Sequence, residues 1–320
     1  MTIAVIGAGA FGTAMAITLG RIGPVTLLGR NAERMKTLQD TRENQTHLPN
    51  ARLPATVQAS ANNSHLEKAE IILLCLPTQH LSEFLSDHTS ALSNKSLVAC
   101  CKGIDLKTLT GPVDIILQKI PNATASILTG PSFATDIAQG LPTALTIASS
   151  RDFEAERLQK TLSSSTLRLY RTTDVIGAQL GGALKNVIAI AAGACIGARL
   201  GESARAALIA RGFAEMQRLA HHFGAKPETL MGLSGFGDLI LTCSSAQSRN
   251  FSYGLAIGSN ASYDPTKTVE GAATAQALTK IAKLNGLDLP VCACVNDLVS
   301  GRTTVTSALK DLLARPLTHE

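Results

Sequence analysis

Residues 1–16 read MTIAVIGAGAFGTAMA and combine three features in a fixed order. The apolar, β-branched run 3–6 predicts a buried strand, residues 7–12 fit the pattern G-x-G-x-x-G, and residues 13–17 predict a helix. In such a unit Gly7 permits the tight turn, Gly9 lets the backbone approach a pyrophosphate, and Gly12 allows the helix to pack closely on the strand. The helix N-terminus adds free N–H groups and a positive dipole. We therefore expect a dinucleotide-binding turn here rather than an ordinary structural one.

The residue after the second predicted strand indicates which dinucleotide is bound. Residues 25–29 read VTLLG, and an NAD site would place Asp or Glu next, about 20 residues past the glycines, to hold the ribose 2′-hydroxyl. This chain has Arg30 instead, whose guanidinium fits a 2′-phosphate. We therefore expect NADPH/NADP to be preferred over NADH/NAD. Two alternatives are that Arg30 stacks on adenine without discriminating, or that it is an exposed residue at a strand end.

Composition restricts the class of partner. The chain has 320 residues, 45% of them hydrophobic, which is enough for two domains with cores of their own. Its formal charge of +5 is modest and no Lys/Arg block occurs, so we expect a small anionic ligand and no nucleic acid. The seven cysteines contain no C-x-x-C pair and the histidines no H-E-x-x-H, so we expect reduced thiols and no metal.

The sequence shows no targeting segment. The N-terminus lacks a basic stretch before its apolar run, and that run is already used as the first strand. The longest apolar run, Val187–Ala198, is too short to span a bilayer. We therefore expect a cytoplasmic protein without membrane insertion.

Apolar strand-like runs recur in the first half at Ile71–Leu76, Leu97–Cys101, Ala125–Leu128, Ala144–Ala148 and Leu167–Tyr170. Polar or helical stretches separate several of them, which is typical of a doubly wound, mainly parallel sheet. Ligands of such sheets bind at the carboxyl ends of the strands.

From Asp174 onward the sequence changes to long segments rich in Ala, Leu, Ile and Gly, such as 175–199 and 204–223. Their length and their few β-branched runs predict helices. The expected fold is α/β, with an N-terminal Rossmann-like doubly wound sheet followed by a mostly α-helical C-terminal domain. We assign residues 1–185 to a dinucleotide-binding domain and 186–320 to a helical substrate and catalytic domain.

Lys185 stands in the apolar segment GGALKNVIAI, residues 181–190. Burying an ammonium group is costly unless it is paired or its pKa falls, and a lowered pKa is what a general base requires. A lysine on a helix can instead extend its stem to bring the charge to solvent. Because its neighbours on both sides are apolar or glycine, we favour a catalytic role.

Three further segments carry candidate groups. Asp238 follows the glycine-rich loop 232–237, where it either caps a helix or holds a lysine or a substrate hydroxyl. Residues 248–250, Ser-Arg-Asn, offer a guanidinium, a hydroxyl and an amide to a phosphate. Lys102 and residues 130–134, GPSFA, each follow a predicted strand and so lie at the ligand-binding edge, although a solvated lysine and a proline turn are the simpler interpretations.

Taken together, these segments resemble bacterial-type NAD(P)-dependent glycerol-3-phosphate dehydrogenase. The resemblance rests on GAGAFGT at residues 7–13, KGI at 102–104, GPSFA at 130–134, GGALKNVIAIAAG at 181–193, GLSGFGDLILT at 232–242, SRN at 248–250 and VEG at 269–271. It covers nearly the whole chain, with several long motifs in the same order.

The resemblance implies roles for the residues that match it. Lys185 would be the proton acceptor. The implied contacts to glycerol 3-phosphate are Lys102, Gly130, Ser132, Lys185, Asp238, Ser248, Arg249 and Asn250. The implied cofactor site, with the glycines of the turn, comprises Gly7, Gly9, Ala10, Phe11, Gly12, Arg30, His47, Lys102, Ala134, Arg249, Val269 and Glu270. Ala10 stands where the family often has serine, and His47 where it often has tyrosine.

The expected reaction is hydride transfer between a nicotinamide cofactor and C2 of sn-glycerol 3-phosphate or dihydroxyacetone phosphate, with supply of glycerol 3-phosphate to phospholipid synthesis as the implied purpose. A homodimer is the candidate assembly. One rival is a related reductase of the 6-phosphogluconate or ketopantoate kind. The other is a nucleotide-sensing protein without catalysis, which gives no reason to keep a lysine in an apolar helix.

Overall fold

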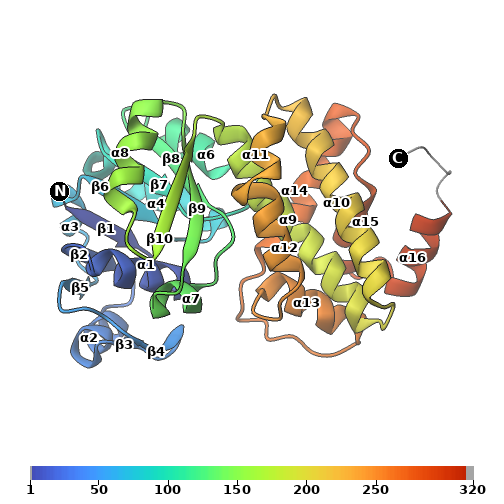
Figure 1. The fold of residues 1–320 in the computed structure, drawn as a ribbon, viewed down its shortest axis with the longest axis horizontal. Coiled ribbons are helices and arrows are strands. Elements are labelled where there is room, and N and C mark those ends of the chain that lie inside the picture. The colour runs from blue at the N-terminus through green and yellow to red at the C-terminus, as the bar shows by residue number, and fades with distance from the viewer. Residues whose placement is uncertain (1, 315–320) are drawn as a thin grey trace.

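The structure is a computed structural model that describes residues 2–314. Figure 1 shows two parts side by side: a sheet covered by helices, formed by the N-terminal half, and a bundle of helices formed by the C-terminal half. Helix α9 (Val175–Gly197) follows the last strand and passes into the centre of the bundle.

The sheet has eight strands in the order β10-β9-β8-β7-β6-β1-β2-β5. Neighbouring strands are parallel except β8 and β9, which are antiparallel. The bounds are β1 (Ile3–Ile6), β2 (Val25–Leu28), β5 (Val57–Ser60), β6 (Ile71–Leu74), β7 (Ser96–Ala99), β8 (Thr124–Thr129), β9 (Thr143–Ser149) and β10 (Leu167–Thr172). This confirms the predicted doubly wound, mainly parallel sheet.

The order of the strands reverses at β1, because β2 and β5 extend the sheet on one side and β6 to β10 on the other. The carboxyl ends of β1 and β6 therefore border the crevice in which such sheets bind ligands. The glycine-rich turn follows β1, and Pro77 with helix α4 follows β6.

Both faces of the sheet are buried. In β1, Ile3 and Val5 point into one apolar core, and Ala4 and Ile6 into the other. A strand covered on both faces has no polar side, which explains why β1 and β6 are uninterrupted apolar runs. The first core contains residues of α1 (Ala10–Gly20), α2 (Ala32–Thr41), α7 (Ala134–Gln139) and α8 (Asp152–Leu162). The second contains residues of α3 (His65–Lys68), α4 (Thr78–Asp87), α5 (Thr89–Leu92) and α6 (Pro112–Lys119).

The sequence did not predict the antiparallel hairpin of β3 (Glu43–Asn44) and β4 (Leu48–Arg52) or the edge strand β5. The buried side chain of Asn44 fixes the hairpin to the glycine-rich turn. Its Nδ2 donates to the carbonyl of Ala8 at 2.9 Å and to Oγ1 of Thr13 at 2.7 Å. The hairpin is therefore a wall of the crevice.

The C-terminal part is helical, as predicted. Around α9 lie α10 (Glu202–His222), α11 (Pro227–Met231), the π-helical turn η1 (Leu233–Gly237), α12 (Asp238–Cys243), α13 (Arg249–Gly258), α14 (Glu270–Asn285) and α15 (Pro290–Val299). Helix α16 (Val305–Leu313) packs on α15. The predicted domain division at residue 185 falls inside α9, which is continuous across it. Because α9 contributes Ala178 to a sheet core and Val187 to the bundle core, it belongs to both parts.

Helix α9 is longer than the apolar run recognised in the sequence. By length and hydropathy its 23 residues could cross a membrane, yet 83% of its most apolar window is buried inside the protein. Its small side chains allow other helices to surround it, so α9 is the central helix of the bundle. The seven cysteines are free thiols, five of them buried, in agreement with the prediction.

Candidate functional site

Lys185 lies nearly three turns into α9 and is buried, with 6% of its surface exposed. Its Nζ donates to Oδ1 of Asp238 at 2.6 Å and to Oγ1 of Thr242 at 2.8 Å. The lysine therefore does not extend to solvent, which was the alternative interpretation of its sequence. Paired burial is the arrangement expected of a lysine with a chemical task.

Asp238 begins α12 and is completely buried. Its second oxygen, Oδ2, accepts from Nζ of Lys102 at 2.7 Å, so one carboxylate holds two ammonium groups. Lys102 follows β7 at the carboxyl edge of the sheet, and its side chain is 16% exposed. Of the two roles considered for Asp238, binding a lysine is confirmed, and the site joins the sheet to the bundle.

The pKa values in this cluster are shifted in directions that suit proton transfer. Burial lowers the pKa of Lys185 to about 8; the charge of Asp238 acts against this, and the charge of Lys102 reinforces it. Burial alone would raise the pKa of Asp238, but the two lysine charges outweigh it and hold that pKa below its usual value. The carboxylate therefore stays ionised while Lys185 changes protonation near neutral pH.

Sequence reasoning missed two polar side chains beside Lys185. Oγ1 of Thr242 accepts from Lys185 and donates to Oδ1 of Asp238 at 3.2 Å, closing a triangle. Thr242 stands one helical turn after Asp238, and this spacing was the available signal. Asn186 is also buried, and its Oδ1 accepts from Nδ2 of Asn250 at 2.9 Å.

The loop after β8 borders the lysine cluster. The carbonyl of Gly130 accepts from Nζ of Lys102 at 3.3 Å and from Oγ of Ser132 at 3.4 Å. Gly130 has a φ of 135°, which favours glycine at this position. The structure thus brings together Lys102, Gly130, Ser132, Lys185 and Asp238, five of the eight predicted substrate contacts.

The predicted phosphate-binding residues begin α13. Oγ of Ser248 accepts from the N–H of Phe251 as the helix cap, and the side chain of Asn250 is engaged in the interior, where its Oδ1 accepts from the N–H of Gly271 at 2.9 Å. Arg249 is exposed, and none of the described residues forms an ion pair with it. Arg249 is therefore the exposed cation of the three, while the side chains of Ser248 and Asn250 each keep one hydrogen that these hydrogen bonds do not use.

Helices α9 and α13 approach each other closely through glycines. A side chain at Gly193 would lie 2.0 Å from the carbonyl oxygen of Phe251, and one at Gly254 would lie 2.0 Å from that of Ile190. Only glycine tolerates this approach at these two positions. Since Lys185 lies on α9 and Arg249 starts α13, the packing fixes the backbone positions of these two residues relative to each other.

The turn after β1 fits a dinucleotide pyrophosphate. Gly7 has a φ of 103°, and a Cβ at Gly12 would lie 1.9 Å from the carbonyl oxygen of Gly7, so both positions require glycine. A Cβ at Gly9 would meet nothing within 4 Å, which leaves open space beside the backbone. Helix α1 starts at Ala10 without a side-chain cap, so the N–H groups of its first turn, which includes Phe11, face this space unpaired.

Arg30 and His47 lie at the other end of the crevice. Arg30 is exposed directly after β2, and His47 is exposed in the β3–β4 hairpin. Nε2 of His47 lies 2.9 Å from Nη2 of Arg34, a residue that sequence reasoning did not select. Partial burial lowers the pKa of His47, and the charges of Arg34 and Arg249 lower it further.

Glu270 begins α14 and lies beside Gly103, where a Cβ would approach its Oε2 to 3.4 Å. Burial raises the pKa of Glu270 to about 7, although the charge of Arg249 and the N–H of Thr78 act in the opposite direction. A carboxyl group with this pKa can both donate and accept near neutral pH. Ala134 begins α7 and is half-buried against the first sheet core.

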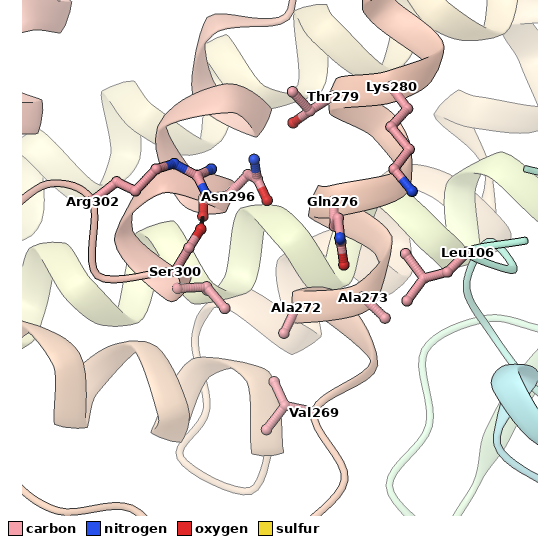
Figure 2. A pocket seen from close by; sticks show the side chains of 11 residues that line it. Leu106, Val269, Ala272, Ala273, Gln276, Thr279, Lys280, Asn296, Ser300 and Arg302 are labelled. Atoms are coloured by element: carbon pink, nitrogen blue, oxygen red, sulfur yellow. Dashed lines mark hydrogen bonds between the residues drawn. The ribbon is translucent and has the colours of Figure 1, made fainter.

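A surface groove of about 580 Å³ lies on the bundle, between α14, α15 and Leu106. Figure 2 shows Gln276 and Lys280 on one side of it and Asn296 and Arg302 on the other. Val269, one of the predicted cofactor contacts, lines this groove. The lysine cluster does not belong to it. Within residues 2–314, no group of three His, Cys, Asp or Glu side chains could hold a metal ion.

The turn after β1 has unpaired N–H groups for a pyrophosphate, and Lys185 has a pKa of about 8. Together these two features suit a reaction that couples hydride transfer to proton transfer. The protein is therefore a dinucleotide-dependent dehydrogenase that consists of a sheet part and a helical part. The model of the NAD-dependent glycerol-3-phosphate dehydrogenase N-terminus matches residues 2–155, and that of the C-terminus matches residues 174–310. The chain belongs to the NAD-dependent glycerol-3-phosphate dehydrogenase family.

Individual relatives agree with this assignment along the whole chain. A glycerol-3-phosphate dehydrogenase (NAD(P)+) of Roseobacter denitrificans is 55% identical over 320 residues, which are all of both chains, and that of a Ruegeria species gives the same values. The crystal structure of glycerol-3-phosphate dehydrogenase from Coxiella burnetii superimposes with a TM-score of 0.93 at 33% identity, covering 98% of this chain and 99% of the other.

Proposed function

We propose that this protein interconverts sn-glycerol 3-phosphate and dihydroxyacetone phosphate with NAD(P)(H), and that Lys185 transfers the proton. The observation that carries the proposal is the buried cluster in which Asp238 holds Lys185 at 2.6 Å and Lys102 at 2.7 Å. This cluster lies at the edge of the sheet where the dinucleotide-binding turn also opens.

In oxidation, Lys185 accepts the proton of the C2 hydroxyl. In reduction, its ammonium form donates a proton to the oxygen at C2. The nicotinamide, when bound, supplies or accepts the hydride at C2. Asp238 orients both lysines and compensates one of their two positive charges, while Lys102, with the more exposed side chain, stabilises negative charge developing on the substrate oxygen.

In this proposal the phosphate of the substrate binds to Arg249 at the start of α13. Ser132 and the first turn of α13 also contact the substrate. The cleft between the two parts is also bridged here, because Oγ1 of Thr135 on α7 donates to Oε1 of Gln247 at 3.0 Å. Ser248 and Asn250 complete the phosphate site in the proposal, because each shapes this turn and keeps one hydrogen that can be donated to the phosphate.

The cofactor lies across the carboxyl ends of β1, β2 and β6. Gly7, Gly9, Ala10, Phe11 and Gly12 receive the pyrophosphate through backbone N–H groups. The adenosine end lies toward Arg30 and His47, and the nicotinamide end toward Lys102, Ala134, Arg249, Val269 and Glu270. We propose a preference for NADPH because Arg30 stands where an NAD site places an acid.

Four further proposals concern the protein in the cell: it is cytoplasmic, it is not inserted in a membrane, it supplies glycerol 3-phosphate for phospholipid synthesis, and it is a homodimer. The division of the chain at residue 185 is likewise a proposal. The groups that face the crevice are suited to a small phosphorylated substrate, which is the partner of the reaction.

The test is the initial rate of NADPH and NADH oxidation with dihydroxyacetone phosphate. Oxidation of NADPH with 2-ketopantoate and reduction of NADP+ with 6-phosphogluconate are measured for comparison. We expect turnover with dihydroxyacetone phosphate only. Activity with 2-ketopantoate instead would identify the related reductase, and binding of NADPH without turnover of any substrate would identify a sensing protein.

A further inference from the structure

The end of the crevice near β2 carries a second cation that is held in place. Arg34 lies in the first turn of α2, where its backbone N–H donates to the Oδ1 of Asn31 at 2.9 Å. Its guanidinium reaches across to the hairpin, 2.9 Å from Nε2 of His47. Within residues 2–314, neither Arg34 nor Arg30 forms an ion pair with a carboxylate. Both therefore have charge available for an anion.

The partners of Arg34 connect it to the pyrophosphate-binding turn. The backbone N–H of His47 donates to Oδ1 of Asn44, and Nδ2 of Asn44 donates to the carbonyl of Ala8. A Cβ at Gly29, the residue before Arg30, would lie 3.3 Å from that of Ala8. Both arginines are thus connected to the turn, Arg30 through Gly29 at the end of β2 and Arg34 through His47 and Asn44.

We propose that Arg34, held by His47, contacts the 2′-phosphate of NADPH together with Arg30 and is a second determinant of the preference for NADPH over NADH. This inference rests on the proposed function, whose cofactor preference it explains. A neutral imidazole accepts from the guanidinium through one nitrogen and leaves the remaining N–H groups of Arg34 free to form a charge-assisted pair with a phosphate.

His47 is suited to the task of an acceptor. Burial and the charges of Arg34 and Arg249 lower the pKa of His47, so the ring is neutral at physiological pH. A protonated ring would donate from both nitrogens and repel Arg34. The histidine therefore fixes the direction of Arg34 without compensating its charge, which an acidic residue at the same position would do.

The experiment measures binding by fluorescence and KM by turnover for the Arg34→Ala variant, with NADPH and NADH. Adenosine 2′,5′-bisphosphate and ADP serve as inhibitors that carry, respectively, the 2′-phosphate and the pyrophosphate. We expect Arg34→Ala to weaken NADPH and the 2′,5′-bisphosphate by about 10- to 100-fold, the range for a lost hydrogen bond to a charged group. NADH and ADP should change by less than about threefold, as for an ordinary surface substitution.

Lys36→Ala is the matched control, because Lys36 is an exposed cation on the same helix with no partner at the crevice. It should leave the ratio of NADPH to NADH affinity unchanged. Equal weakening of all four ligands by Arg34→Ala would overturn the proposal in favour of a pyrophosphate or folding effect. No change in any ligand would overturn it in favour of a plain surface residue.

The role of His47 is tested by His47→Phe alone and combined with Arg34→Ala. If the ring acts by holding Arg34, the single change weakens NADPH by about 2- to 10-fold, and the double variant is no weaker than Arg34→Ala. Additive losses would show that His47 does not act through Arg34. The bisphosphate and ADP are also measured by displacement of bound NADPH, which needs no turnover. Failure of the proposed reaction is therefore recognised separately, as inactivity of the unsubstituted enzyme with dihydroxyacetone phosphate.

Discussion

Lys185 and Asp238 form a buried ion pair, 2.6 Å between Nζ and Oδ1, although 53 residues separate them in the sequence. The pair is not a simple neutral unit, because Lys102 brings a second positive charge to the same carboxylate. With both lysines protonated, the two ammonium groups and the one carboxylate therefore carry a net positive charge. Release of a proton from Lys185 returns the cluster to neutrality, which is the physical basis of the proton transfer proposed here.

Lys185→Met tests that proton transfer directly. General acid–base catalysis contributes about 10²–10⁴-fold, so kcat should fall by at least this range. The fold should survive, because Lys102 still pairs with Asp238 and no buried charge is left alone. The measurements are kcat, NADPH affinity and melting temperature. A near-normal kcat would refute the assignment, and lost affinity together with a lower melting temperature would show that Lys185 is structural.

The pH dependence should have opposite signs in the two directions. Because the pKa of Lys185 is lowered to about 8, its neutral form grows as the pH rises through this value. Oxidation of glycerol 3-phosphate needs the neutral amine, so kcat/KM should rise up to about pH 8 and then level off. Reduction needs the ammonium form, so its rate should fall above about pH 8. Profiles of the same sign in both directions would exclude Lys185 as the titrating group.

Thr242 should act as a positioning residue. Thr242→Val removes a hydroxyl that contacts both Lys185 and Asp238, and the loss of a hydrogen bond to a charged group is expected to lower kcat by about 10- to 100-fold. The apparent pKa of the reaction should shift in the same variant, which a merely structural role would not produce. Thr242→Ser keeps the hydroxyl and is the control that should restore both values.

Arg249→Leu should discriminate between substrates with and without a phosphate. Turnover of dihydroxyacetone phosphate should fall far more than that of unphosphorylated dihydroxyacetone, because only the former has an anion to bind. Arg249→Lys keeps the charge but not the two-pronged geometry and should be intermediate. A uniform loss with both substrates would assign Arg249 to the cofactor, which its effect on the pKa values of His47 and Glu270 also permits.

Much of the sheet could be predicted because strands buried on both faces are apolar runs, and β1, β6 and β7 show them clearly. The strands that escaped prediction lack such runs. In β4, three of the five residues are exposed, and β5 alternates buried and exposed positions over only four residues. The hairpin is held by Asn44, whose hydrogen-bond partners lie more than 30 residues away, and by Leu48, which is buried in the first sheet core.

The site was predictable as a set of residue types but not as a geometry. The sequence singled out Lys185, Asp238 and Lys102 separately, yet that one carboxylate binds both lysines depends on contacts 53 and 136 residues apart. Asn250 carries a contact that its residue type could not reveal, because the side chain predicted to bind the phosphate also joins α9 and α14.

The close approach of α9 to α13 at their glycines fixes the distance between the backbones of the two helices. Backbone packed against backbone has no side chains that can yield, so the distance between the Cα atoms of Lys185 and Arg249, the proposed proton acceptor and phosphate-binding residue, changes little. We therefore expect a substrate with one more methylene between its hydroxyl and its phosphate to bind these two groups less well at the same time. The cleft would then select its substrates by the number of atoms between the hydroxyl and the phosphate.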